Sequence, residues 1–283
     1  MKCALVTGCA GFIASHLVQR LLLDNWNVLG LDNFHPYYDK ELKLKNLANF
    51  KDHKNFKFVE GSILDLDLLK KFSNVDTVFH LAAIAGVRNS FNNPQEYFDI
   101  NVKGTENILK TFQNIDELVF ASSSSVYGEL KQSEFPVKET HSLNPISPYG
   151  ESKKQSELLC ENYSKSSKIR TSILRFYTVY GPRQRPDEAI MKFLNLSISR
   201  EPIPIFDDGT KIRDFTYISD IVNGIILSQK FGNGTYNLGS GNPISVNQMV
   251  DIIEEKLGKK IKRQYLDSPK GDVFKTHADI SKA

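Results

Sequence analysis

Tyr149 and Lys153 stand four residues apart at the start of a stretch with helical character, so they share one face of the predicted helix. A lysine ammonium held close to a phenol favours the phenolate over the neutral phenol. Because an ordinary tyrosine has a pKa of about 10, the pair predicts a tyrosine that accepts a proton near neutral pH. Ordinary surface helices show the same spacing, so the pair indicates a site only in combination with other features.

A run of four serines over residues 122–125 follows a short apolar strand predicted over residues 118–120. In open α/β sheets the ligand crevice lies outside the carboxyl ends of the strands. One of these serines can donate a hydrogen bond to a substrate oxygen there. Combined with the tyrosine and the lysine, it would help to remove the proton of an alcohol while a hydride leaves the attached carbon.

A glycine-rich turn near the N-terminus predicts where a dinucleotide would bind. An apolar strand over residues 2–6 is followed by Gly8, Gly11 and Ala14 at the start of a helix. Gly8 permits a tight turn, and Gly11 lets the backbone approach a pyrophosphate at the helix N-terminus. The small side chain of Ala14 lets the helix pack closely on the strand. This strand, turn and helix together predict a nucleotide cofactor.

Asp32 ends the second predicted strand, 24 positions after Gly8. A carboxylate at this distance meets the ribose hydroxyls of a bound dinucleotide. It also repels a 2′-phosphate, so the cofactor expected here is NAD rather than NADP. The alternative is that Asp32 is simply a turn residue before Asn33.

Strands and helices alternate from residue 1 to residue 176, which predicts an α/β fold with a doubly wound parallel (Rossmann) sheet. Small residues after the third and fourth strands would let the cofactor lie close. The pattern changes after residue 176, and residues 234–238 look like a last strand of the main sheet. We predict an NAD-binding domain of residues 1–176 plus about 215–238. We predict a smaller mixed α/β substrate domain of about 177–214 plus 239–283.

Composition argues against several other classes of protein. The 36 basic and 33 acidic residues of the 283 give a net charge of +3, too small to indicate nucleic acid or a membrane surface as a partner. The three cysteines have no metal-ligand spacing, so we expect reduced thiols and no metal. No apolar run is long enough to span a membrane, and an apolar strand begins directly after Met1 and Lys2. These features predict a cytoplasmic protein.

These motifs in combination resemble the extended short-chain dehydrogenase/reductase family. The matching residues are Thr7-Gly8-x-x-Gly11-Phe12-Ile13-x-Ser15-His16-Leu17, His80-Leu81-Ala82-Ala83, Ser122 to Gly128 and Tyr149-x-x-x-Lys153. The nucleotide-sugar epimerase and dehydratase branch fits best, and the resemblance covers essentially the whole chain. Relatives usually continue for a final helix, so we expect that the sequence ends early at Ala283. A homodimer is implied through helices over residues 94–112 and 148–165.

The resemblance implies a role for each matching residue. Tyr149 and Lys153 match the base and its partner, and Ser123 matches the catalytic Ser/Thr, with Ser124 as the second choice. The cofactor contacts would be Gly8, Gly11, Phe12, Ile13, Asp32, Asn33, Ser62, Ile63, Leu81, Ala82, Ala83, Asn101, Tyr149, Lys153 and Tyr177. Asn101, within a predicted helix, is also compatible with a simple surface amide. The substrate contacts would be Thr178, Arg185, Phe206, Arg213 and Asp272.

The resemblance also implies a reaction. Dehydratases and decarboxylating synthases of this branch carry an acid two residues before the Tyr of their Val-Tyr-Gly, where this chain has Ser125, preceded by Ser124. Epimerisation at C4 through a 4-keto sugar needs no such acid. The loop over residues 181–187 is similar to that of UDP-glucuronate 4-epimerases, in which residues matching Thr178 and Arg185 hold the sugar carboxylate.

Alternatives remain at this stage. Arg185 could instead be a loop arginine paired with Asp187. The enzyme could be a UDP-glucose 4-epimerase, or the fold could serve as a non-catalytic NAD-binding scaffold. The preferred hypothesis is an NAD-dependent epimerase that converts UDP-glucuronate to UDP-galacturonate.

Overall fold

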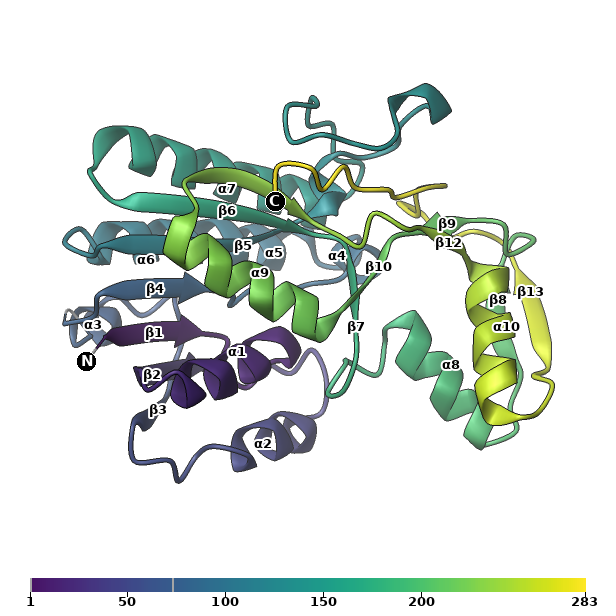
Figure 1. Ribbon diagram of the computed structural model, residues 1–283, viewed down its shortest axis with the longest axis horizontal. Coiled ribbons are helices and arrows are strands. Elements are labelled where there is room, and N and C mark those ends of the chain that lie inside the picture. The colour runs from purple at the N-terminus through teal and green to yellow at the C-terminus, as the bar shows by residue number, and fades with distance from the viewer. Residues whose placement is uncertain (1, 73) are drawn as a thin grey trace.

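A seven-stranded parallel sheet forms the centre of the molecule (Figure 1). A computed structural model describes residues 2–72 and 74–283. The strand order is β11-β6-β5-β4-β1-β2-β3, and every neighbouring pair is parallel. The strands are β1 Cys3–Thr7, β2 Asn27–Asp32, β3 Phe56–Glu60, β4 Thr77–His80, β5 Glu117–Ser123, β6 Arg170–Phe176 and β11 Gly234–Leu238. The predicted doubly wound sheet is confirmed, with 234–238 as its edge strand.

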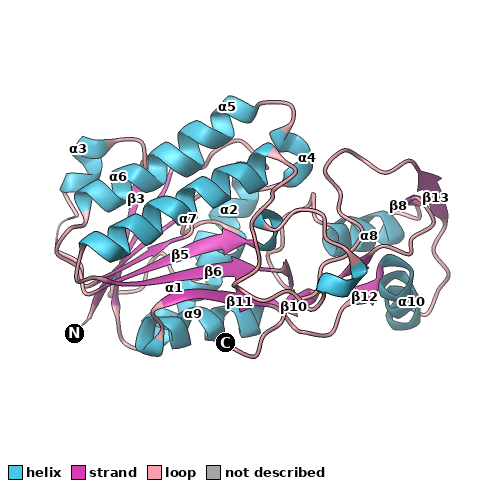
Figure 2. Cartoon of the chain, turned by 90° about the horizontal axis from the view of Figure 1, so that it is seen from above, coloured by secondary structure: helices cyan, strands magenta, loops and turns pink. Residues whose placement is uncertain are grey.

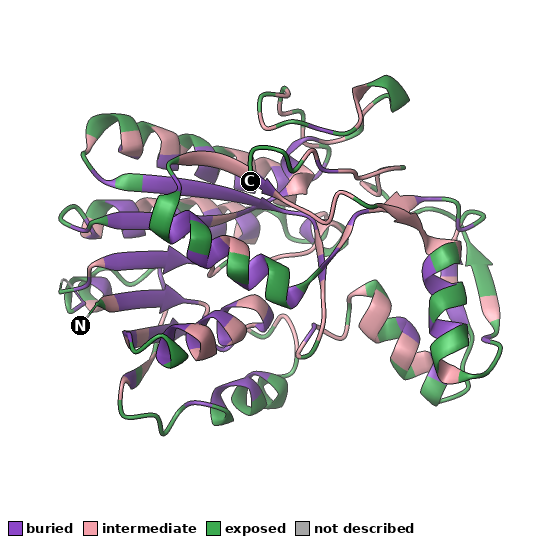
Figure 3. Cartoon of the chain, viewed as in Figure 1, coloured by how far each residue is buried: buried purple, intermediate pink, exposed green. Residues whose placement is uncertain are grey.

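Helices cover both faces of this sheet, because the central strands are apolar on both sides (Figures 2 and 3). Helices α1 and α9 pack on one face, and α3, α6 and α7 pack on the other. The helices of this part are α1 Phe12–Leu23, α2 Lys40–Ala48, α3 Leu66–Lys70, α4 Val87–Ser90, α5 Pro94–Tyr97, α6 Gly104–Thr111, α7 Pro148–Ser166 and α9 Ile218–Phe231. Two separate apolar clusters, one on each face, hold the layers together.

The helix expected over residues 94–112 is not one regular helix. Residues Phe98–Lys103 form a π-helical segment, η1, between α5 and α6. A π-helical turn rotates the side chains that follow it, and such turns are frequent at functional sites. The segment contains Asn101, which it turns toward the interior.

A second group of elements faces the carboxyl ends of the strands (Figure 1). Its members are β7 Thr178–Tyr180, α8 Ala189–Ile198, β8 Ile203–Phe206, β9 Ile212–Arg213, β10 Phe215–Tyr217, β12 Ile244–Ser245, α10 Val246–Leu257 and β13 Arg263–Leu266. They pair two by two as β10-β7, β12-β9 and β13-β8. A third apolar cluster packs α8 and α10 against β8.

The last residues of the chain return to the main sheet. The amide of Ala278 donates to the buried carboxylate of Asp214 at 3.0 Å, and that carboxylate also accepts from the amides of Ser240 and Gly241. Lys282 donates to the backbone oxygen of Thr235 in β11 at 2.7 Å. The carboxylate of Asp214 thus fixes the C-terminal segment beside the edge of the sheet.

Candidate active site

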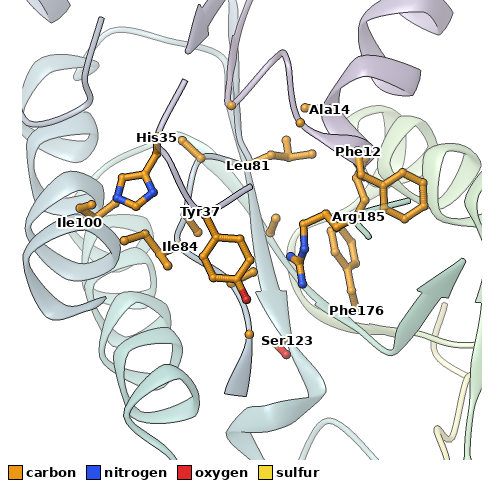
Figure 4. A pocket seen from close by; sticks show the side chains of 18 of the residues that line it. Phe12, Ala14, His35, Tyr37, Leu81, Ile84, Ile100, Ser123, Phe176 and Arg185 are labelled. Carbon is orange, nitrogen blue, oxygen red and sulfur yellow. The ribbon is translucent and has the colours of Figure 1, made fainter. Parts of the chain in front are cut away.

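A cavity of about 460 Å³ lies at the carboxyl ends of the central strands. This is where ligands bind in open α/β sheets. It extends from the glycine turn to the start of α7 and to the loop before α8 (Figure 4). The predicted residues that line it are Gly8, Gly11, Phe12, Ile13, Asp32, Asn33, Ser62, Ile63, Leu81, Ala82, Ala83, Ser123, Tyr149, Lys153, Tyr177, Thr178 and Arg185. One cavity therefore borders the predicted cofactor, proton-transfer and carboxylate residues.

The glycine turn fits a pyrophosphate. Gly8 has a φ of +71°, and a Cβ there would lie 3.0 Å from the backbone of Ala82. Only glycine adopts this conformation at so close an approach without strain. Gly11 is the N-cap of α1 and provides no side-chain cap, so the first amides of α1 are available to an anion. Phe12 and Ile13 begin that helix at the wall of the cavity.

Asp32 is buried at the carboxyl end of β2, with 8% of its surface exposed. It accepts the amide of Ala10 at 3.1 Å and the amide of Phe34 at 2.8 Å. Burial raises the pKa of the carboxyl group, and these two hydrogen bonds and the charge of Lys43 oppose the increase. A carboxylate has about four acceptor positions, so two remain for ribose hydroxyls. Turn amides hold Asp32, as expected for a simple turn residue. Asp32 also lines the cavity, as expected for a contact with the ribose.

A buried histidine supports the turn after β4, and sequence reasoning gave it no role beyond its place in a motif. The ring of His80 bonds to Thr7 at 2.8 Å and to Thr105 at 3.0 Å. Burial lowers the pKa of His80 to about 3, so the ring is neutral. Thr7 in turn accepts the amides of Leu81 and Ala82, both at 3.1 Å. These bonds fix the backbone that approaches Gly8.

Asn101 does not line the cavity, so its position does not support the predicted direct contact with the cofactor. It is 1% exposed, and its amide group exchanges hydrogen bonds with the backbone of Ile84 at 2.8 and 3.0 Å. The same amide donates to the hydroxyl of Ser152 at 2.9 Å. The π-helical segment turns Asn101 inward, so it ties the loop after β4 to helix α7 behind the cavity wall.

Tyr149 lies in the first turn of α7. Ser147 caps this helix by accepting the amide of Gly150 at 3.0 Å, and Pro148 occupies the first helical position. Burial raises the pKa of Tyr149, while a hydrogen bond with Ser123 and the charge of Arg185 act in the opposite direction. Burial has the largest effect, so the pKa of Tyr149 is raised overall, whereas pairing with Lys153 predicts a lowered pKa.

Lys153 is one turn further along the same face of α7, as predicted. Its ammonium lies 4.3 Å from the centre of the Phe120 ring. Burial lowers its pKa to about 8, while Cys160 and Glu157 raise it. The lysine therefore sits close to the balance between its charged and neutral forms near physiological pH.

Ser123 and Ser124 occupy different positions. Ser123 is the last residue of β5, lines the cavity, and donates to the hydroxyl of Ser125 at 3.1 Å. Ser124 begins a 3₁₀ turn, η2 Ser124–Val126, and is not among the lining residues. The geometry thus favours Ser123 over the second choice. The neighbouring Ser122 also lines the cavity, which the sequence did not single out.

Arg185 lines the cavity, as expected for a residue that holds the sugar carboxylate. It is also paired with Asp187, as expected for a loop arginine. Its guanidinium donates to Asp187 at 3.0 and 3.2 Å and contacts Glu188 at 3.0 Å. It lies 5.3 Å from the centre of the Tyr37 ring, which Figure 4 shows beside it. The charges of Glu188 and Asp187 raise the pKa of Arg185 although burial opposes this. Tyr37 itself donates to Asp187 at 3.2 Å.

Phe206, Arg213 and Asp272 lie apart from the lining of this cavity but close to one another. Arg213 bonds to Asp272 at 2.7 Å. Two residues that sequence reasoning missed join them. Arg88 of α4 lies 4.3 Å from the centre of the Phe206 ring, and Lys211 bonds to Asp272 at 3.0 Å. An aromatic ring and three cations, with Asp272 and with Asp207 beside Lys211, form a cluster that suits an anionic, planar ligand.

The signal that points to Arg88 in the sequence is its position soon after the small residues that follow β4. No group of histidine, cysteine and acidic residues suited to a metal ion is present among residues 2–72 and 74–283. Within the same residues, no helix is long and apolar enough to cross a membrane.

Comparison with known proteins places the chain in a family. The profile of the GDP-mannose 4,6 dehydratase family matches residues 5–281. The chain belongs to this family. The GDP-mannose 4,6 dehydratase family is part of the extended short-chain dehydrogenases/reductases, so the resemblance found in the sequence is confirmed.

Several relatives in the family are UDP-sugar epimerases by name. A UDP-glucuronate 4-epimerase of Thermodesulfobacterium geofontis is 45% identical over 99% of this chain and 88% of its own length. A protein of Bacillus subtilis named as an uncharacterized UDP-glucose epimerase is also 45% identical, over 99% of this chain and 90% of its own. The crystal structure of a UDP-glucuronic acid 4-epimerase from Bacillus cereus, in complex with UDP-glucuronic acid and NAD, is 38% identical. It matches with a TM-score of 0.94 over 99% of this chain and 91% of its own.

Proposed function

We propose that the protein is an NAD-dependent UDP-sugar 4-epimerase and that UDP-glucuronate, converted to UDP-galacturonate, is its preferred substrate. The observation that carries the proposal is the shared cavity, in which Tyr149, Ser123 and Lys153 border the same space as the glycine turn and Asp32. The names of the relatives at 45% and 38% identity support the same activity.

The residues present fit a bound NAD. Gly8, Gly11 and the uncapped start of α1 would hold the pyrophosphate, and Asp32 would hold the adenosine ribose. Bound NAD would accept a hydride from C4 of the sugar and return it to the opposite face. Lys153, buried in α7, would bind the second ribose and contribute its charge to the site.

Tyr149 would take the proton of the 4-hydroxyl, assisted by its hydrogen bond with Ser123. The same phenol would return the proton after the 4-keto sugar has turned about its diphosphate link. Elimination of water would need an acid beside this group, and the chain has Ser124 and Ser125 there. The absence of a carboxyl group at these two positions supports epimerisation over dehydration.

The preference for glucuronate rests on Thr178 and Arg185. Both line the cavity that contains Tyr149. A 4-keto glucuronate is a β-keto acid that loses CO2 easily, so a guanidinium and a hydroxyl that hold the carboxylate would both select the sugar and restrain this loss. Phe206, Arg213 and Asp272, with Arg88 and Lys211, would bind the UDP portion.

UDP-glucose is a second candidate substrate, and one observation favours it. Arg185 already has two acidic partners, Asp187 and Glu188, which compensate its charge without a ligand. A neutral hydroxymethyl group would enter this site without disturbing the ion pairs. The Bacillus subtilis relative carries the name of a UDP-glucose epimerase.

We also propose how the chain is divided between cofactor and substrate. We propose that residues 1–176 plus about 215–238 bind NAD and that about 177–214 plus 239–283 bind the nucleotide sugar. The buried residues that join α8, β8 and α10 all lie within the second part, which supports the division. We further propose a homodimer through residues 94–112 and 148–165, where Leu158 in α7 remains 55% exposed, and a cytoplasmic location.

The test is turnover of UDP-glucuronate and UDP-glucose, in parallel, by purified protein with added NAD. The 4-epimers are separated by chromatography or identified by NMR. We expect UDP-galacturonate as the main product, and we expect Tyr149→Phe to lower kcat by roughly 10³-fold. The exposed Tyr265→Phe in β13 is the matched control. Main turnover of UDP-glucose would overturn the carboxylate assignment, and no turnover of either sugar would overturn the proposed function.

A further inference from the structure

A buried ion pair lies directly behind the serine end of β5. The side chains of Glu157 in α7 and Arg175 in β6 are 1% and 4% exposed. The guanidinium donates from Nε to both carboxylate oxygens, at 3.0 and 3.2 Å, and from Nη2 to Oε2 at 2.7 Å. Ser122 in β5 donates its hydroxyl to Oε1 of the same carboxylate. One side chain therefore joins a helix to two strands.

This side chain lies in line with the proton-transfer residues. Tyr149, Lys153 and Glu157 follow one another at intervals of four in α7, so they share one helix face. Ser122, which Glu157 holds, is the neighbour of Ser123 in β5. The distance between Ser123 and Tyr149 thus depends on how α7 is fixed against β5, and the carboxylate of Glu157 fixes it.

The far side of the ion pair is anchored independently. Arg175 donates from Nη1 to the hydroxyl of Tyr127 at 2.9 Å and to the backbone oxygen of Glu139 at 3.0 Å. Tyr127 donates to Asn237 of the edge strand β11 at 2.7 Å. Because Arg175 is held by these other groups, it presents a rigid surface against which Glu157, and with it α7, is placed.

The charge of Glu157 also acts on Lys153. The groups that face the Lys153 ammonium are Glu157 and Cys160 in α7, His80 in β4 and the ring of Phe120 in β5. Burial raises the pKa of the Cys160 thiol and lowers that of His80, so both are neutral near pH 7. The carboxylate is then the negative charge that favours the protonated lysine against the effect of burial.

We propose that Glu157 is a positioning residue for the reaction, which sets Ser123 against Tyr149 through Ser122 and places a carboxylate one helical turn after Lys153. It does so without contact with the sugar or the cofactor. The inference rests on the proposed function, because it assigns a purpose to the arrangement of Tyr149, Lys153 and Ser123.

The first test compares Glu157→Gln with wild type and with Glu161→Gln, which removes a half-buried carboxylate one turn further along α7. The glutamine keeps the size of the side chain and its ability to accept from Ser122. We expect kcat near pH 7.5 to fall by roughly tenfold or more, with little change in KM for the UDP-sugar. The Glu161→Gln control should keep the wild-type kcat.

The pH profile separates positioning from a loss of stability. Activity that needs a protonated Lys153 is lost as pH rises through the pKa of this lysine. Removal of the carboxylate lowers that pKa, so the basic limb of the kcat profile should move to lower pH by about one unit in Glu157→Gln. NMR titration of ¹³C-labelled lysine side chains, assigned with Lys153→Met, should show the same displacement without any turnover.

The Glu157→Gln variant leaves Arg175 without its charged partner, so this variant can fail to fold. The double variant Glu157→Gln/Arg175→Met removes both charges, and we expect it to recover thermal stability while its basic limb stays below that of wild type. Profiles and lysine titrations that coincide with wild type in a folded variant would overturn the proposal. If the wild-type protein turns over no UDP-sugar, the proposed function fails, whereas the lysine titration still decides the effect of Glu157.

Discussion

Strand β5 has a buried carboxylate at each of its two ends, and both carboxylates pair with arginines of β6. At the carboxyl end, Glu157 receives three hydrogen bonds from Arg175, which is almost fully buried. At the amino end, Glu117 is fully buried, while its partner Arg170 is 43% exposed. One carboxylate oxygen of Glu117 has no hydrogen-bond partner in the part of the chain that the structure describes. Burial raises the pKa of Glu117 to about 7.

The two ends of β5 differ in whether every polar group of the buried ion pair has a partner among the described residues. A buried ion pair is costly unless all its polar groups are satisfied. The chain satisfies them at the end of the sheet that borders the cavity. At the opposite end it leaves the carboxyl group of Glu117 able to take up a proton.

Replacing each of the two arginines in turn should give the largest difference in stability between the two ends of β5. Arg175→Met should lower the free energy of unfolding by about 3–5 kcal/mol, because it leaves Glu157 buried and uncompensated. Arg170→Met should cost about 1 kcal/mol, because its pair is partly exposed and Glu117 can become neutral. Denaturant unfolding at pH 7.5 measures both values. Equal losses would mean that the two ends of β5 do not differ.

The pH dependence of stability gives a smaller effect at the amino end. Because the pKa of Glu117 is raised in the folded state to about 7, the folded protein holds more protons than the unfolded chain between pH 5 and 7. This contribution to stability is present at low pH and is lost as pH rises through 7. Glu117→Gln should remove roughly 1–3 kcal/mol of that decrease. Unfolding curves at pH 5, 6, 7 and 8 test it, and parallel curves for variant and wild type would contradict it.

The third pair, between Arg185 and Asp187, lies on a loop and extends the comparison to the mouth of the cavity. Asp187 is 38% exposed, so its hold on the guanidinium is weaker than that of a buried acid. Asp187→Asn should lower KM for UDP-glucuronate by about threefold and leave KM for UDP-glucose unchanged. The exposed Asp208→Asn is the control, and an equal change for both sugars would show that Asp187 does not compete with a sugar carboxylate.

Much of the fold could be predicted because it depends on local patterns. The period of the apolar residues, together with the glycine turn, predicts the parallel sheet through β6, and the position of Asp32 follows from the end of β2. The shared face of Tyr149 and Lys153 required only the helical repeat. The carboxyl ends of the strands then brought these residues to one cavity without further information.

The remainder depends on contacts that no local pattern shows. Asn101 is turned inward by a π-helical segment, so a regular helix gives the wrong surroundings for it. Burial has the largest effect on the pKa of Tyr149, and burial is set by residues from the whole chain. Glu157 looked like any polar helix residue, because its partners Ser122 and Arg175 lie 35 and 18 positions away.

The position of the edge strand β11 determines when the sheet can be completed during synthesis. Its residues Gly234–Leu238 pair with β6, which ends at Phe176, so the chain places α8, β8 and β9 between two neighbouring strands of one sheet. A ribosome releases β6 long before its partner, and until then the strand presents an open edge of unpaired backbone groups. Glu139 and Asn237 meet only when β11 arrives, which makes closure of the sheet a late step of synthesis.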